Sequence, residues 1–200
     1  SEDEIQAAQS PQEVLRFLYL KSKVRLQHLL WGKNERLKEI VSVNNQEDRF
    51  LEFRALIQQR EGLQQLLDCF PFLISTNVSC SKLASAEPIF DRMIMDEAGQ
   101  CSNPLSLLPM ARCRRALFVG DPSQLQPVIT LPSSRNTRLV WDYDIPQAYD
   151  YKMNSILSTM LKVDTLSKFI LLKHHYRCAD PIIAFSNQKY YGGELVLSLS

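Results

Sequence analysis

Apolar residues recur at helical spacing through the first third of the chain, from Ser10 to about Leu67. Apolar side chains at every third or fourth position fall on one face of a helix. The pattern therefore predicts two or three long amphipathic helices. Pro11 after Ser10 is typical of a helix start, and Asn44-Asn45 predicts a break between helices.

From Phe70 onward the pattern changes to short apolar runs rich in β-forming residues, which suit parallel strands covered on both faces. Between the runs Met93–Met95 and Ala116–Val119, residues 104–112 are long enough for one crossover helix. The predicted fold class is therefore α/β. Polar residues and prolines between Ile129 and Asp150 predict a surface excursion. The four runs are Phe72–Thr76, Met93–Met95, Ala116–Val119 and Phe169–Leu172.

Composition and charge exclude several classes of protein. The formal net charge of +1 gives no overall attraction to nucleic-acid backbones or membranes, so any nucleic-acid contact must be local. Five cysteines without a CxxC pair argue against a disulfide framework or a zinc cluster. No apolar run reaches the roughly 18 residues of a membrane span, and the N-terminus is acidic. We expect an intracellular protein, cytoplasmic or nuclear, with no membrane segment.

The strand predicted at Met93–Met95 ends in two adjacent carboxylates, Asp96 and Glu97, followed by Ala-Gly-Gln. In a parallel sheet the carboxyl ends of the strands face the ligand crevice. One carboxylate of such a pair can hold Mg²⁺ through water while the other orients the attacking water. Taken alone, however, an acidic pair after a strand is more often a solvated loop.

A second strand, Ala116–Val119, ends about twenty residues downstream in another polar turn. Gly120 permits a tight or left-handed backbone, and Gln124 places an amide able to sense a terminal phosphate oxygen. Two polar turns at the ends of successive strands favour a site at one edge of the sheet.

A third polar stretch follows the predicted strand Phe169–Leu172. Arg177 could reach across a cleft as an arginine finger, or could be a surface arginine in a salt bridge. The adjacent His174 and His175 would point to opposite faces of a strand, so we assign them no chemistry.

Taken together, these motifs resemble the superfamily 1 helicases, in the branch that contains senataxin and the nonsense-mediated-decay helicase. The resemblance covers Phe70 to about Leu195 and rests on DEAGQ as motif II, GDPSQLQPV as motif III, and HYR with the following YYGGEL as motif IV and its sequel. It implies a RecA-like parallel sheet of the P-loop NTPase type, ATP and Mg²⁺ as cofactors, and single-stranded RNA or DNA as partner.

The resemblance also implies roles for individual residues. Asp96 would hold Mg²⁺ through water, Glu97 would be the general base, and Arg177 would be the arginine finger. The remaining candidates form three groups: Gln100 and Gln124, which would couple the γ-phosphate to nucleic acid; Gly120, Asp121 and Tyr176, which would lie at the nucleotide; and Thr76 and Asn77, which would touch the nucleic-acid backbone or equally serve as turn residues.

The domains implied are a helical accessory or stalk segment over residues 1–69, part of a first RecA-like domain over 70–165, and the start of a second over 166–200. Basic residues of the helical segment could form a strip that grips nucleic acid, although solvated helix faces are the simpler interpretation. Protein partners through this segment remain open.

The pattern GxxxxGK[ST], the phosphate-binding loop of such motors, occurs nowhere in the 200 residues, and the later motifs are also missing. Two interpretations follow. The chain is the central segment of an ATP-dependent helicase, or it is a non-catalytic module that binds nucleic acid or protein. Either way, we expect the isolated chain not to hydrolyse ATP.

Overall fold

A computed structural model describes residues 11–28, 34–84, 87–175 and 178–197. The chain divides into two compact units, and each unit combines two separate stretches of sequence. The first unit comprises residues 1–93 and 104–117, and the second comprises residues 94–103 and 118–200.

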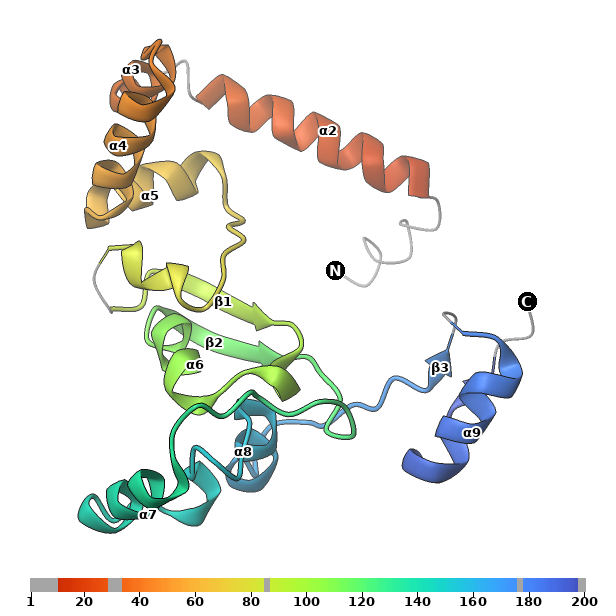
Figure 1. The fold of residues 1–200 in the computed structure, drawn as a ribbon. Coiled ribbons are helices and arrows are strands. Elements are labelled where there is room, and N and C mark those ends of the chain that lie inside the picture. The colour runs from red at the N-terminus through yellow and green to blue at the C-terminus, as the bar shows by residue number, and fades with distance from the viewer. Residues whose placement is uncertain (1–10, 29–33, 85–86, 176–177, 198–200) are drawn as a thin grey trace. The chain divides into compact units, whose positions relative to one another are not determined.

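The first unit begins with helices, as the apolar spacing predicts (Figure 1). The described residues of this region form four helices rather than two or three: α2 (Pro11–His28), α3 (Glu35–Ser42), α4 (Gln46–Ile57) and α5 (Arg60–Cys69). The break predicted at Asn44-Asn45 is confirmed, because Asn45 caps α4 by accepting a hydrogen bond from the Glu47 backbone N–H at 2.9 Å.

The hydrophobic core of this unit lies among α3, α4 and α5. Leu63 and Cys69 of α5 are completely buried in it. The amphipathic prediction is wrong for α2, whose apolar residues Leu15 and Leu18 are 66% and 52% exposed. The core residues are Leu37, Ile40, Leu56, Leu63, Leu66, Cys69, Leu83 and Ala84.

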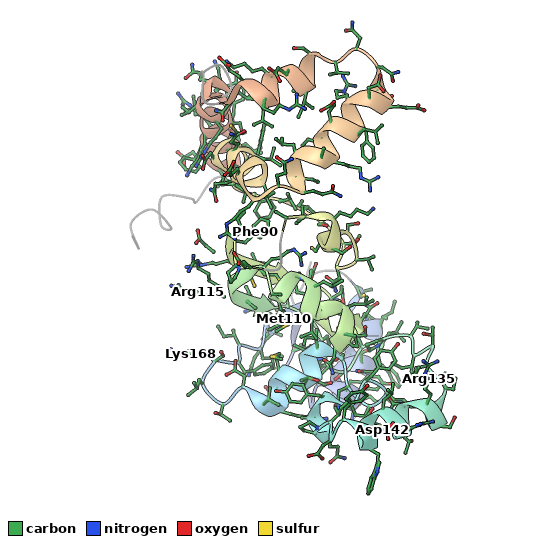
Figure 2. All side chains as sticks on the ribbon, turned by 90° about the vertical axis from the view of Figure 1, so that its left-hand side faces the viewer. Phe90, Met110, Arg115, Arg135, Asp142 and Lys168 are labelled. Atoms are coloured by element: carbon green, nitrogen blue, oxygen red, sulfur yellow. The ribbon has the colours of Figure 1, made fainter. Side chains whose placement is uncertain are left out.

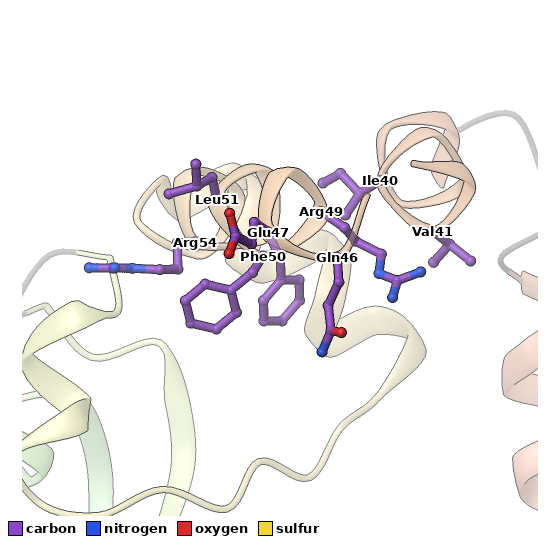
Figure 3. A pocket seen from close by; sticks show the side chains of 9 residues that line it. Ile40, Val41, Gln46, Glu47, Arg49, Phe50, Leu51 and Arg54 are labelled. Atoms are coloured by element: carbon purple, nitrogen blue, oxygen red, sulfur yellow. The ribbon is translucent and has the colours of Figure 1, made fainter. Parts of the chain in front are cut away.

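An open groove of about 890 Å³ lies along α4 beside the end of α3 (Figure 3). Phe50 of α4 lines this groove and is 59% exposed. The guanidinium of Arg54 lies 5.8 Å from the centre of the Phe50 ring, which is a cation–π contact.

The sheet is built from β1 (Phe90–Met95) and β2 (Cys113–Phe118), connected through α6 (Asn103–Met110). At one end the Phe90 N–H donates to the Arg112 carbonyl at 3.0 Å, and at the other the Val119 N–H donates to the Met95 carbonyl at 2.8 Å. Hydrogen bonds in this order make the two strands parallel. The predicted strand–helix–strand unit is confirmed; Figure 2 marks Met110 on its helix and Arg115 on its second strand.

Two of the four predicted strands are wrong. Phe72–Thr76 and Phe169–Leu172 pair with no strand in the described residues, and Ile74 and Ile170 are 86% and 75% exposed. A strand needs a hydrogen-bonded neighbour as well as an apolar run, and neither run has one here. The strand β3 begins later, at His174–His175, and pairs in parallel with β4 (Val196–Leu197), His174 lying opposite Val196.

The second unit also holds α7 (Ser133–Asp142), the short 3₁₀ turn η4 (Gln147–Tyr149), α8 (Ile156–Val163) and α9 (Asp180–Tyr190). The predicted excursion over 129–150 therefore contains a helix; Figure 2 labels Arg135 in its first turn and Asp142 at its end. Buried Asn136 anchors this helix by donating to Asp150 Oδ1 at 2.9 Å. A polar helix fixed by a side-chain hydrogen bond lacks the apolar pattern that would have revealed it.

Candidate functional site

The first polar turn follows the end of β1 and contains Asp96 and Glu97. Glu97 has a left-handed backbone, with φ 50° and ψ 39°, and leads into the 3₁₀ turn η3 (Ala98–Gln100). A left-handed conformation costs a non-glycine residue about 1–2 kcal/mol. Here the turn is closed by the Gln100 N–H, which donates to the Glu97 carbonyl at 2.8 Å. The backbone therefore reverses direction at the second carboxylate.

The polar residues of this turn, Asp96, Glu97 and Gln100, are exposed, and their side chains take part in hydrogen bonds within the turn. The Glu97 N–H donates to Asp96 Oδ1 at 2.9 Å, and Gln100 Nε2 donates to Glu97 Oε2 at 3.2 Å. The structure thus brings three sequence-predicted site residues into one turn.

The second polar turn follows β2 and begins at Gly120. Asp121 organises it: its Oδ1 accepts the Ser123 N–H at 2.8 Å, and its Oδ2 accepts from Gln124 Nε2 at 3.1 Å. The Gln124 amide is therefore held by Asp121 while its side chain stays exposed.

The two turns pack against each other backbone to backbone. The Ala98 N–H donates to the Val119 carbonyl at 2.8 Å. A methyl group on Gly120 would lie 3.0 Å from the backbone nitrogens of Ala98 and Gly99, and one on Gly99 would lie 3.0 Å from the Asp121 carbonyl oxygen. Close approach, rather than a left-handed backbone, is thus why glycine is needed at 120. Both turns lie at the same edge of the sheet.

Helix α8 packs against the two turns. A Leu157 methyl carbon would lie 3.2 Å from a methyl group on Gly120, and the Ile156 N–H donates to the Cys101 carbonyl at 2.9 Å. Completely buried Thr159 accepts from Asn103 Nδ2 at 2.9 Å and donates to the Ala148 carbonyl at 2.8 Å. These contacts hold the turn after β1 against α8.

A further side chain reaches the second turn from α9. The Tyr191 hydroxyl donates a hydrogen bond to Asp121 Oδ2, the oxygen that also accepts from Gln124. This hydrogen bond, together with burial and the Asp121 charge, raises the pKa of Tyr191 to about 12, and a hydrogen bond from Gln124 opposes the shift.

Thr76 and Asn77, two further predicted site residues, belong to the first unit. Thr76 closes a turn before the 3₁₀ segment η2 (Ser79–Lys82), where its Oγ1 accepts the Ser79 N–H at 3.2 Å. Thr76 therefore has the turn role that the sequence left as an alternative. Asn77 follows it in the same turn. Tyr176 and Arg177 lie outside the described residues.

The described residues form no group of three or more His, Cys, Asp or Glu side chains that could hold a metal ion. All five cysteines are free thiols, and burial raises the pKa of Cys113. Across the same part of the chain, the helices are too short or too polar to cross a membrane.

A family model described as AAA domain matches residues 3–131, a stretch that includes the helices of the first unit and both polar turns. The chain belongs to the AAA domain family. Because the match runs continuously, the helical segment and the sheet form part of one AAA domain sequence.

Several curated proteins that are similar to the chain are helicases by name. The mouse 5'-3' DNA helicase ZGRF1 is 28% identical over 84% of this chain and 9% of its own length. The mouse DNA replication ATP-dependent helicase/nuclease DNA2 is 29% identical over 66% of this chain and 11% of its own length. Helicase SEN1 of Saccharomyces cerevisiae is 29% identical over 62% of this chain and 5% of its own length. These relatives support the superfamily 1 helicase family, and the chain spans a small part of each.

Sequence reasoning missed two parts of this AAA domain site. Helix α8 could have been predicted from Ser155, which precedes an apolar stretch. Ser155 caps the helix by accepting the Ser158 N–H at 3.2 Å. Tyr191 lies in the YYGGEL stretch, but its contact with Asp121 has no local signal, because the two residues are 70 positions apart in the sequence.

Proposed function

We propose that the chain is the central segment of an ATP-dependent helicase or translocase that acts on single-stranded RNA or DNA. The observation that carries the proposal is the pair of polar turns, DEAGQ and GDPSQLQPV, packed together at the carboxyl ends of two parallel strands. A RecA-like sheet of the P-loop NTPase type presents its nucleotide motifs at this edge. The senataxin-like branch is proposed from the motif endings.

Asp96 is the proposed Mg²⁺ ligand, acting through water. Its carboxylate is exposed, and Oδ2 accepts no hydrogen bond from the described residues while Oδ1 holds the Glu97 N–H. Magnesium keeps several waters and uses one or two carboxylates together with substrate phosphates, so a single available carboxylate fits it. When bound with ATP, the ion would neutralise charge on the transferred phosphoryl group.

Glu97 is the proposed general base. Its left-handed backbone sets its carboxylate in the turn beside Asp96, and Gln100 donates to Oε2 and so orients it. A carboxylate fixed by one hydrogen bond keeps its second oxygen for an attacking water molecule. Strained residues cluster at catalytic sites, which supports this role.

Gln124 is the proposed sensor of the γ-phosphate, held by Asp121 at 3.1 Å. Gln100, Gly120 and Asp121 complete the edge that would face the nucleotide. The roles of Tyr176 beside adenine, of Arg177 as arginine finger, and of Thr76 and Asn77 at the nucleic acid are carried over from the helicase motifs.

Nucleic acid is the proposed partner because the relatives include proteins named as DNA helicases. The helical segment before the sheet is proposed as an accessory part of the first domain. Its continuous inclusion in the family match supports this assignment.

The test is substitution of the proposed base in the full-length protein. Glu97→Gln removes the base and keeps Asp96, so nucleotide binding should persist while turnover on single-stranded nucleic acid falls by about 10² or more. Steady-state ATP hydrolysis and equilibrium binding of a fluorescent ATP analogue measure the two quantities.

Asp91→Asn is the matched control, since Asp91 is an exposed carboxylate on β1, the strand that precedes Glu97. This variant should hydrolyse ATP at the wild-type rate. Wild-type turnover in Glu97→Gln would overturn the assignment of Glu97.

A further inference from the structure

Asp121 is shared by two side-chain donors that come from different parts of the second unit. Gln124 Nε2 donates to Oδ2 from within the same turn, and the hydroxyl of Tyr191, the residue that directly follows α9, donates to the same oxygen. A carboxylate oxygen that accepts two donors holds each of them in relation to the other.

The segment that carries Tyr191 is fixed at several points. Asn187 of α9 is 9% exposed, and its side chain brackets Leu195: Nδ2 donates to the Leu195 carbonyl and Oδ1 accepts the Leu195 N–H, both at 3.0 Å. Gly193, with φ 82°, returns its N–H to the Asn187 carbonyl at 3.0 Å. The turn after Tyr191 is therefore closed onto the helix before it.

The same segment is joined to the short sheet of β3 and β4. The Val196 N–H donates to the Lys173 carbonyl at 2.8 Å, and Lys173 Nζ forms an ion pair with Glu194 at 3.0 Å. Helix α9 and the two strands thus form one hydrogen-bonded block with Tyr191 at its edge.

We propose that Tyr191 is a positioning residue that ties this block to Asp121 and so makes the orientation of the Gln124 amide depend on the position of α9. The inference rests on the proposed function, because it gives a purpose to the amide that would sense the γ-phosphate. Tyr191 touches neither nucleotide nor metal in this scheme and acts through Asp121.

The chemistry of the contact between the Tyr191 hydroxyl and the Asp121 carboxylate supports a hydrogen bond that persists at neutral pH. The hydroxyl donates to a carboxylate, and charge-assisted hydrogen bonds are stronger than neutral ones. With its pKa raised to about 12, the hydroxyl remains a donor throughout the neutral range. If α9 moves, the Asp121 carboxylate either moves with the Tyr191 hydroxyl or forms a hydrogen bond with water in its place. In both cases the acceptor of the Gln124 amide is no longer held in its present position.

Tyr191→Phe in the full-length protein tests the inference, because it removes only the hydroxyl. Turnover stimulated by a single-stranded oligonucleotide should fall about tenfold, while the KM for ATP changes by less than about twofold. Tyr190→Phe is the matched control: Tyr190 precedes it, is exposed, and contacts Lys189 rather than Asp121. This control should keep the wild-type stimulation.

A double-variant cycle with Asp121→Asn separates coupling from a general loss of stability. If Tyr191 acts through Asp121, adding Tyr191→Phe to Asp121→Asn should lower stimulated turnover no further. Independent, multiplicative losses would overturn the inference, as would equal losses in Tyr191→Phe and Tyr190→Phe.

The failures of the two proposals can be told apart. If Glu97→Gln loses turnover but Tyr191→Phe behaves as the wild type, the helicase assignment stands and the coupling is wrong. If the wild-type protein shows no hydrolysis stimulated by nucleic acid, both proposals fall together.

Discussion

At the scale of single residues, Glu97 is the site residue with a left-handed backbone among those described. Glu97 and Asp144 are the non-glycine residues with positive φ in the described part of the chain. The cost at Glu97 is offset by hydrogen bonds in the turn that follows it, because the Ala98 N–H donates to the Val119 carbonyl and the Gln100 N–H donates to the Glu97 carbonyl. Strain held by its surroundings keeps the carboxylate in one arrangement before any ligand arrives.

The hydroxyl of Tyr191 should titrate far above the usual range. Its pKa of about 12, raised from 10.0 by the hydrogen bond to Asp121, means that it ionises later in the folded than in the unfolded chain. The stability contributed by this contact is therefore fully present below about pH 10 and lost as pH rises through about 12. Tyrosine ¹³Cζ NMR titration measures the midpoint, with the signal assigned by its absence in Tyr191→Phe. Asp121→Asn should move the midpoint back toward 10.0, and a wild-type midpoint near 10.0 would contradict the contact.

The sequence identifies some of these residues and not others for a physical reason. Asp96, Glu97 and Gln124 directly follow apolar runs, so a local pattern predicts them. The role of Tyr191 depends on a long-range contact with Asp121. The role of Thr76 depends on the length of the turn that follows it. Neither can be derived from neighbours in the sequence alone.

At the scale of elements, the two turns are held together by a contact that has no room for a side chain. Gly120→Ala should destabilise the protein by about 1–3 kcal/mol, because the added methyl group meets backbone nitrogens that cannot rotate away. Urea unfolding followed by circular dichroism measures the change. Ser123→Ala, an exposed position in the same turn, should stay within about 0.5 kcal/mol of the wild type. An unchanged midpoint in Gly120→Ala would mean that the turns are not packed in this way.

The elements themselves were predictable where two signals agreed. β1, α6 and β2 combine apolar runs with a spacer of helical length, and all three form. The runs at Phe72–Thr76 and Phe169–Leu172 had composition alone, and composition does not supply a neighbouring strand. The helix α7 is the opposite case, because it forms although it was not predicted. It is held by the polar side chain of Asn136 rather than by an apolar face.

At the scale of the whole molecule, each compact unit depends on a stretch that is distant in sequence. In the second unit, completely buried Ala98 and the Cys101 carbonyl, which holds the Ile156 N–H, come from residues 94–103. A chain of residues 94–200 should therefore unfold cooperatively in urea, whereas residues 118–200 should not, because α8 loses its buried partners. Equal midpoints and equal cooperativity for the two chains would contradict this division.

The interleaving of the units also bears on how such a protein can change by recombination. The chain passes between the units after Met93, after Asn103 and after Leu117, so neither unit corresponds to one continuous block of coding sequence. Exchange of a gene segment with one boundary between residues 97 and 120 would separate Asp96 and Glu97 from the turn of Gly120 and Asp121. The two motifs are therefore expected to be inherited as a linked pair, with insertions and losses confined to the loops outside them.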